Sequence, residues 1–245
     1  MATRTPPQAV VFDWGGTLTP YHDVDLLDLW RVAADVLAPE QAPELADALA
    51  AAERAWWESA VATGRSGTTA DVVAAAVAST GIPVDVALHD AALNAHLQAW
   101  SPHTVTDPEA GPVLRALRKR GLRLGLLSNT HWPRAWHESW LARDGVLDLL
   151  DARIYTSELA TLKPHAPAFR AILAALRIGD PTAAVFVGDR PYDDIYGAQA
   201  MGMRAVLRPN AVVPAYDVRP DARISRLSDL LPLVDGWLND RGTPR

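Results

Sequence analysis

A few polar residues in this chain have the types and spacing that phosphoryl chemistry needs. Asp13 follows the apolar residues 9–12, Ser128 follows residues 122–127, and Asp189 follows residues 183–187 after one glycine. A carboxylate at a strand end can ligate a metal or attack phosphorus, and a hydroxyl there can bind phosphate oxygens. Lys163 can neutralise charge between a carboxylate and a phosphoryl group. Each residue also has a structural alternative, because Asp and Ser commonly cap turns and helices and most lysines are solvated surface charges.

Carboxylates are concentrated after the third of these runs. Asp189 is followed by Asp193 and Asp194 within the stretch GDRPYDDIYGA. Clustered carboxylates suit a hard, oxygen-seeking ion such as Mg²⁺. Asp194 also precedes an expected helix, and a carboxylate at the N-terminus of a helix interacts favourably with the helix dipole. Asp189 is the preferred ligand, and the spacing allows either Asp193 or Asp194 to face the same site.

The elements that must position these side chains form an α/β pattern. Short apolar runs at residues 9–12, 122–127, 183–187 and 204–207 predict buried parallel strands, and residues 154–155 begin a further one. Expected helices at residues 112–120 and 167–176 end near glycines. The predicted fold is a Rossmann-like parallel sheet. Ligands bind at the carboxyl ends of such strands, which is where Asp13, Ser128 and Asp189 stand.

The span from residue 21 to residue 100 contains no strand pattern. Its Ala-, Leu- and acid-rich sequence predicts helices at residues 25–37, 43–63, 69–79 and 84–100. We expect an α/β core domain from residues 1–20 and 101–245, and a smaller all-helical cap domain from residues 21–100.

Composition narrows the partners. The 245 residues are 49% apolar, carry a net charge of −6 and include no cysteine, which excludes disulfides and thiolate chemistry. The acidic balance without a basic run argues against nucleic acid and membrane as partners. No apolar run approaches the roughly 18 residues of a membrane span. We expect a cytoplasmic monomer or homodimer whose partner is a small-molecule phosphorylated substrate.

In order along the chain, the stretches FDWGGTLT, LLSNT, LKPHAPAF and VFVGDRPYDDIYGAQAMGM resemble the four motifs of the haloacid dehalogenase-like (HAD) superfamily. The helical insert resembles its cap. The resemblance implies that Asp13 is the nucleophile forming an aspartyl-phosphate and that Lys163 bridges it to the phosphoryl group. It implies substrate binding by Ser128, Asn129 and Gly16. It also implies Mg²⁺ held by Asp13, the Gly15 carbonyl and Asp189, supported by Asp194 or Asp193.

Gly15 departs from the pattern of phosphatases in this superfamily, which carry a second Asp as general acid/base at that position. The backbone carbonyl survives the change, but the proton donor does not; His22 is a candidate replacement. Dehalogenases of the superfamily place Tyr there and work without metal. The phosphonate-cleaving branch needs a cap lysine, and residues 21–100 contain none.

The sequence therefore predicts a Mg²⁺-dependent phosphatase acting through Asp13, slowed by Gly15. The alternative is a regulatory protein of the same fold that binds phosphate and metal without useful turnover. A 2-haloacid dehalogenase-like hydrolase ranks third.

Overall fold

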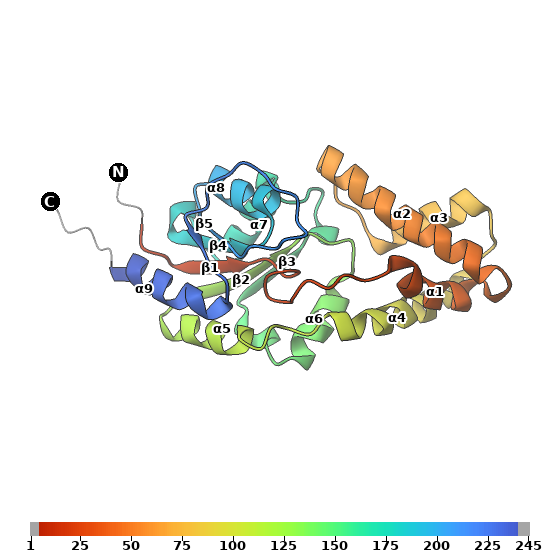
Figure 1. Cartoon of the computed structure of the whole chain (residues 1–245), viewed down its shortest axis with the longest axis horizontal. Coiled ribbons are helices and arrows are strands. Elements are labelled where there is room, and N and C mark those ends of the chain that lie inside the picture. The colour runs from red at the N-terminus through yellow and green to blue at the C-terminus, as the bar shows by residue number, and fades with distance from the viewer. Residues whose placement is uncertain (1–4, 240–245) are drawn as a thin grey trace.

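A six-stranded parallel sheet forms the centre of the chain. The computed structural model describes residues 5–239, and its strands lie in the order β3-β2-β1-β4-β5-β6 (Figure 1). Their bounds are β1 Ala9–Phe12, β2 Arg123–Ser128, β3 Ala152–Tyr155, β4 Ala184–Gly188, β5 Arg204–Leu207 and β6 Ala222–Arg223. The order reverses direction at β1 and β4, which pair directly. Such a switch point opens a crevice at the carboxyl ends of the two strands.

The sheet is covered on both faces because alternate strand residues point to opposite sides. In β1, Val10 and Phe12 join one hydrophobic cluster, and Ala9 and Val11 join the other. Helices α5 (Ala110–Lys119), α6 (Arg134–Arg143) and α9 (Leu230–Asn239) lie on the first face, and α7 (Ala166–Ala175) and α8 (Gly197–Ala200) on the second (Figure 1). Burial on both faces explains why these strands read as continuous apolar runs.

The helices divide between this core and a separate helical unit. Those of the core are α5 Ala110–Lys119, α6 Arg134–Arg143, α7 Ala166–Ala175, α8 Gly197–Ala200 and α9 Leu230–Asn239. Those of the helical unit, here called the cap, are α1 Leu26–Leu37, α2 Ala42–Thr63, α3 Thr69–Thr80 and α4 His89–Trp100. Figure 1 shows the cap beyond the carboxyl edge of the sheet. This architecture confirms the predicted fold class.

Local signals set the bounds of the cap helices. The Asp25 side chain accepts a hydrogen bond from Leu27 N and begins α1. Thr68 and Asp71 form a capping box at the start of α3. Gly64 and Gly81 end α2 and α3 in the left-handed conformation. The cap has its own hydrophobic cluster, centred on Trp30, Leu45 and Leu49.

The structure differs from the sequence expectation at a few ends. The helix expected over residues 84–100 is a 3₁₀ turn at Val86–Leu88 followed by α4, because Asp85 caps at Ala87 N and starts the turn there. The strand expected at 122–127 lies one residue later, so Ser128 belongs to β2. Strand β6 was not predicted, since its two residues are largely exposed. Between residues 5 and 239, no helix combines the length and apolar character needed to cross a membrane.

Candidate active site

Three buried carboxylates meet at the switch point of the sheet. Asp13 follows β1 and Asp189 follows β4, while Asp194 lies on the π-helical turn Pro191–Tyr196. One carboxylate oxygen of each lies within 4.8 Å of the others. All three side chains are almost completely buried. The structure thus brings together the acids that the sequence placed at the strand ends, with Asp194 as the third member.

Lys163 joins two of these acids. Its Nζ donates to Asp13 Oδ1 at 2.6 Å and to Asp194 Oδ1 at 2.7 Å. Asp194 Oδ2 accepts from Arg190 N at 2.9 Å, which holds the turn against the strand end. Asp193 also lines the cavity, but its carboxylate lies 3.8 Å from Arg190 rather than on Lys163. The geometry therefore favours Asp194 over Asp193 as the supporting acid.

The site carries more negative than positive charge, and its pKa values reflect this. Burial is the largest influence on Asp13 and raises its pKa to about 7; Lys163 opposes the rise, and Asp194 and Asp189 add to it. Burial, followed by Asp194, raises the pKa of Asp189 to about 6. Burial opposes the charge of Lys163, yet the neighbouring Asp13 and Asp194 raise its pKa above the ordinary value. One ammonium group faces three carboxylates.

The residues present fit a hard divalent cation. Asp189 Oδ2 accepts from Asn210 Nδ2 at 2.9 Å, but the buried Asp189 Oδ1 has no hydrogen-bond partner. A buried carboxylate oxygen without a partner is costly, and a nearby cation would satisfy it. The donor set consists of oxygen atoms, as Mg²⁺ prefers.

Glycines allow the acids to pack this closely. Gly16 has φ +80°, and a Cβ there would lie 2.1 Å from Asp189 Oδ2. A Cβ on Gly188 would lie 2.3 Å from Asp194 Oδ2. Gly15 differs, because a Cβ there would meet nothing within 4 Å. A side chain at position 15 is therefore compatible with the backbone and its surroundings.

Ser128 and Asn129 lie beside the acids at the end of β2. Ser128 is buried and lines the same cavity as Asp13. Asn129 Nδ2 donates to Lys163 O at 3.1 Å, and Lys163 N donates to Asn129 Oδ1 at 2.8 Å. In this structure the Asn129 amide therefore fixes the segment that carries Lys163. Its predicted contact with substrate, like that of Ser128 and Gly16, remains a prediction.

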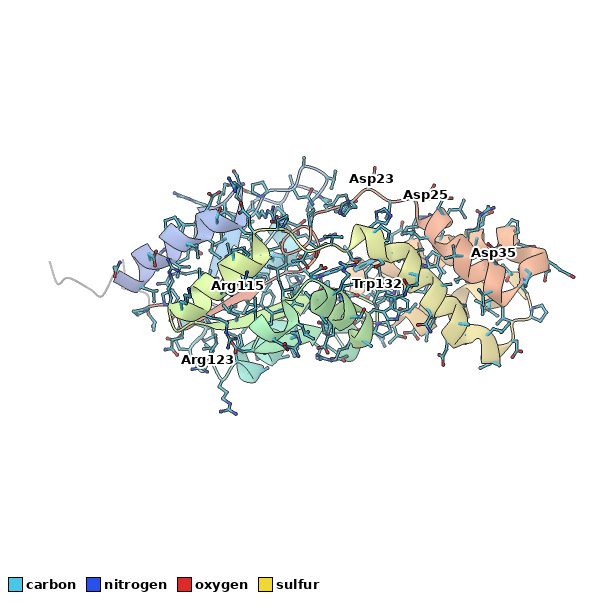
Figure 2. All side chains as sticks on the ribbon, turned by 90° about the horizontal axis from the view of Figure 1, so that it is seen from below. Asp23, Asp25, Asp35, Arg115, Arg123 and Trp132 are labelled. Atoms are coloured by element: carbon cyan, nitrogen blue, oxygen red, sulfur yellow. The ribbon has the colours of Figure 1, made fainter. Side chains whose placement is uncertain are left out.

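A cavity of about 390 Å³ opens between this edge of the sheet and the cap. Its lining includes Asp13, Lys163 and Asp189 on the core side and Glu53 and Trp57 on the cap side. Trp132 lines the same cavity and lies where the two units meet (Figure 2). His22 also lines the cavity, so the candidate replacement acid lies at the carboxyl edge of the sheet, as Asp13 does.

The cap is hydrogen-bonded to the core through a second buried polar cluster. Glu53 of α2 accepts from Trp30 Nε1 at 2.6 Å and contacts His131 Nε2 at 3.0 Å. Thr69 N donates to His131 O at 2.8 Å. Burial opposes ionisation of Glu53, yet the hydrogen bonds from His131 and Trp30 outweigh it and lower its pKa. Nothing in the sequence linked Glu53 with His131, because they lie 78 residues apart.

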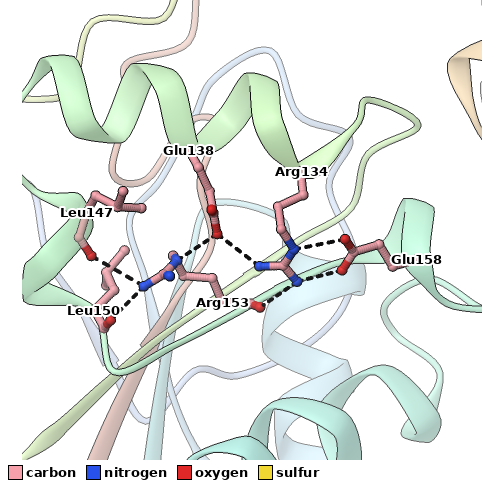
Figure 3. A network of polar contacts seen from close by, with 6 residues as sticks. All are labelled: Arg134, Glu138, Leu147, Leu150, Arg153 and Glu158. Atoms are coloured by element: carbon pink, nitrogen blue, oxygen red, sulfur yellow. Dashed lines mark hydrogen bonds and ion pairs between the residues drawn. The ribbon is translucent and has the colours of Figure 1, made fainter.

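An ion-pair network holds α6 over the end of β3. Arg134 donates to both oxygens of Glu158, at 2.8 and 2.5 Å, and to Glu138 at 2.9 Å (Figure 3). Arg153 joins Glu138 at 2.9 Å and also donates to the Leu150 carbonyl. The network fixes the helix that supplies Trp136, His137 and Trp140 to the aromatic wall behind the cavity. Trp136 and Trp140 are core residues rather than cavity lining.

Comparison with known proteins gives a consistent result. The model of a hydrolase family, described as haloacid dehalogenase-like hydrolase, matches residues 7–202. A glyceraldehyde 3-phosphate phosphatase from Pyrococcus abyssi is 31% identical over 140 residues, 56% of each chain. A phosphoserine phosphatase from Thermus thermophilus is 33% identical over 124 residues, 50% of this chain and 49% of the relative. The chain spans about half the length of these curated relatives.

Solved structures match almost the whole chain. A 2-haloacid dehalogenase from Pseudomonas syringae pv. Tomato superposes with a TM-score of 0.69 at 29% identity, covering 94% of this chain and 99% of that one. A HAD phosphatase from Thermococcus onnurineus superposes with a TM-score of 0.63 at 21% identity, covering 94% and 98%. The second likeness, at its low identity, shows the fold alone.

Proposed function

Because the chain belongs to the haloacid dehalogenase-like hydrolase family, we propose that it is a Mg²⁺-dependent phosphatase of a small phosphorylated metabolite. The observation that carries the proposal is the buried group of Asp13, Asp189 and Asp194, with Lys163 as its sole ammonium and one carboxylate oxygen unsatisfied. Such a group needs a cation and, with one, suits an anionic phosphoryl group. The phosphatases among the curated relatives support the same choice.

The proposed roles follow from position. Asp13 attacks phosphorus and forms an aspartyl-phosphate, while Lys163 reduces the repulsion between this carboxylate and the phosphoryl oxygens. Ser128 binds a phosphoryl oxygen. Asp13, Asp189 and the Gly15 carbonyl would hold Mg²⁺, with Asp194 supporting them. When bound, the ion supplies positive charge that offsets the surplus carboxylates and the charge of the phosphoryl group.

Gly15 limits the proposed reaction. General acid–base catalysis contributes about 10²–10⁴-fold, and position 15 provides no group for it. The chain therefore turns over slowly unless another group, of which His22 is the candidate, supplies the proton or the leaving group needs none. The regulatory alternative, in which the chain binds phosphate and metal without useful turnover, is the limiting case of this loss.

The test is hydrolysis of p-nitrophenyl phosphate with Mg²⁺ and with EDTA, by the wild type and by Asp13→Asn. We expect Mg²⁺-dependent phosphate release that falls at least about 10³-fold in Asp13→Asn, as for other nucleophile deletions. Asp194→Asn and Asp193→Asn form a matched pair, and only the first should abolish most activity. Full activity in Asp13→Asn would overturn the mechanism, and silence from a folded wild type would favour the regulatory alternative.

A 2-haloacid dehalogenase is the second candidate, because such an enzyme is 29% identical over nearly the full length. In this candidate Asp13 would attack the carbon that bears the halogen and displace halide, forming an ester that water hydrolyses. The dehalogenases resembled in sequence place Tyr where this chain has Gly15, and they do not use the metal for which the three acids here are suited. Halide release from 2-chloropropionate in EDTA, lost in Asp13→Asn, would establish this candidate over the phosphatase.

A further inference from the structure

Indole side chains make up much of the cavity wall around the proposed nucleophile. Trp14 and Trp132 come from the core, and Trp57 and Trp100 from the cap. Trp14 directly follows Asp13, and the rings of Trp100 and Trp132 lie 4.8 Å apart at an angle of 62°. Trp57 and Trp100 are only half-buried, so ring surface remains for a ligand. Flat aromatic groups gain from contact with such surfaces.

Charges in the cavity disfavour a second anionic group on the substrate. Among its described lining residues the cap supplies neither lysine nor arginine, and its carboxylate, Glu53, is bound by Trp30 and His131. Lys163 is engaged by two acids of the core. Arg190 belongs to the core edge and lies 3.8 Å from Asp193. A leaving group bearing a carboxylate or a further phosphate would therefore find no lysine or arginine partner on the cap.

Gly15 provides the third observation. It lines the cavity, carries no proton donor and leaves open space where a side chain would stand. An alkoxide leaving group needs a general acid, because alcohols are very weak acids. An aryl oxygen needs much less help, since a phenol has an ordinary pKa of about 10. The bare position also makes room for a ring beside Asp13.

From these three observations we infer that the substrate is an aryl phosphate monoester whose ring is uncharged, and that the ring binds between Trp57 and Trp100 of the cap and the indoles of the core. The inference rests on the proposed phosphatase function. Trp57 and Trp100 are then specificity-determining residues. Neither the family assignment nor the named relatives specify such a substrate.

The reaction balances without an added reagent. An Asp13 carboxylate oxygen forms a bond to phosphorus as the bond between phosphorus and the aryl oxygen breaks. The electron pair leaves with the aryl oxygen, which takes a proton from water. A second water then attacks phosphorus, releasing inorganic phosphate and a proton and restoring the Asp13 carboxylate. Only the first of these displacements depends on the leaving group, so kcat/KM reports it.

The experiment compares kcat/KM for 2-naphthyl phosphate, acetyl phosphate and glycerol 3-phosphate, all with Mg²⁺. Acetyl phosphate has a good leaving group without a ring, and glycerol phosphate has a poor one. We expect 2-naphthyl phosphate to exceed glycerol phosphate by at least about 10²-fold. Gly15→Asp should raise the glycerol phosphate value by about 10²–10⁴-fold and so reduce the ratio of the naphthyl value to the glycerol value.

Tryptophan-to-alanine variants separate recognition of the substrate ring from the chemical step. Trp57→Ala should lower the naphthyl value about tenfold and leave the acetyl phosphate value within about twofold, because only the naphthyl ring stacks. Trp237→Ala is the control: this half-buried indole of α9 lies outside the cavity lining, so the ratio should stay unchanged. Activity on acetyl phosphate shows that each variant is folded.

Two results would overturn the inference in distinguishable ways. Equal kcat/KM for the naphthyl and glycerol esters, unchanged in Trp57→Ala, would reject the aryl substrate while leaving the phosphatase function intact. Absence of hydrolysis of acetyl phosphate as well would reject the proposed function itself, and the substrate class with it.

Discussion

Two buried polar clusters face the same cavity and differ in how completely their charges and hydrogen-bonding atoms are paired. The catalytic-edge cluster consists of Asp13, Lys163, Asp189 and Asp194 and is unbalanced, with one carboxylate oxygen left without a partner. The cap-interface cluster consists of Trp30, Glu53, Thr69 and His131. In it both oxygens of Glu53 and both ring nitrogens of His131 have partners.

The pKa values express this contrast. Burial, the largest influence in the catalytic-edge cluster, raises the pKa of Asp13 to about 7, with further carboxylates adding to it. In the cap-interface cluster hydrogen bonds outweigh burial, and the pKa of Glu53 falls below its ordinary value. A buried polar cluster whose groups all have hydrogen-bond partners stabilises the docked cap. A cluster that leaves a carboxylate oxygen without a partner is suited to binding a cation or a ligand.

The largest effect should come from removing the ammonium of the unbalanced cluster. Lys163→Met leaves three buried carboxylates without their cation, and such a loss costs about 3–5 kcal/mol of unfolding free energy. Urea unfolding at pH 8 in EDTA would measure it. Lys119→Met removes the chain's other lysine, which is exposed, and should change little. Equal stability of the two variants would contradict the contrast.

A smaller loss is expected in the balanced cluster. Glu53→Gln keeps the shape but weakens the bonds from Trp30 and His131, and we expect the free energy of unfolding to fall by about 1–3 kcal/mol. Glu58→Gln is the matched control, because this residue lies on the exposed side of the same helix. Thermal unfolding of both variants checks the expectation, and an unchanged Glu53→Gln would show that the interface bonds contribute nothing.

Removing a carboxylate from the catalytic edge should have the opposite sign. Asp189→Asn relieves repulsion with Asp13 and Asp194, so the metal-free protein should gain about 1 kcal/mol of unfolding free energy. The stabilisation that Mg²⁺ gives the wild type should disappear in this variant. Melting temperatures in EDTA and in Mg²⁺ provide both readings. If Asp189→Asn were less stable than the wild type in EDTA, repulsion among the three carboxylates would not destabilise the metal-free cluster.

The sequence predicts the helices and strands that carry the two clusters better than it predicts which side chains contact one another. Strands β1 and β5 have the predicted bounds because their residues are buried on both faces, which leaves an unambiguous apolar run. The meeting of Asp13 and Asp189 followed from the rule that strand ends share one edge. Asp194 could be separated from Asp193 only in three dimensions, since the π-helical turn decides which acid reaches Lys163.

Contacts between distant segments were beyond the sequence. Asn210 holds Asp189 from a loop that carries no motif. Glu53 is one of many acids on a cap helix, and its bond to His131 joins segments 78 residues apart. Their pairing depends on how the cap docks, and this depends on packing rather than on any local pattern.

The pH dependence of stability gives the last test, because it depends on two buried histidines, His96 and His137, next to the two clusters. Burial lowers the pKa of His96 to about 4 and of His137 to about 3, both below the ordinary value of 6.5. Below pH 6.5 the unfolded chain binds protons that the folded chain does not, so the free energy of unfolding falls as pH drops towards 4. Each histidine contributes at most about 1.4 kcal/mol per pH unit.

His96→Phe isolates one of these contributions. His96 stacks on Trp30 and accepts from Trp100 Nε1 at 3.1 Å, so the neutral ring connects the interface cluster with the aromatic wall. The variant keeps a ring but cannot titrate. It should be less stable at pH 7.5, because it loses the hydrogen bonds with Trp100 Nε1 and with the Leu29 carbonyl. It should nevertheless lose less stability than the wild type between pH 6.5 and 4. Parallel stability–pH curves would show that the folded chain protonates His96 freely, and the aromatic wall would then not depend on its neutral form.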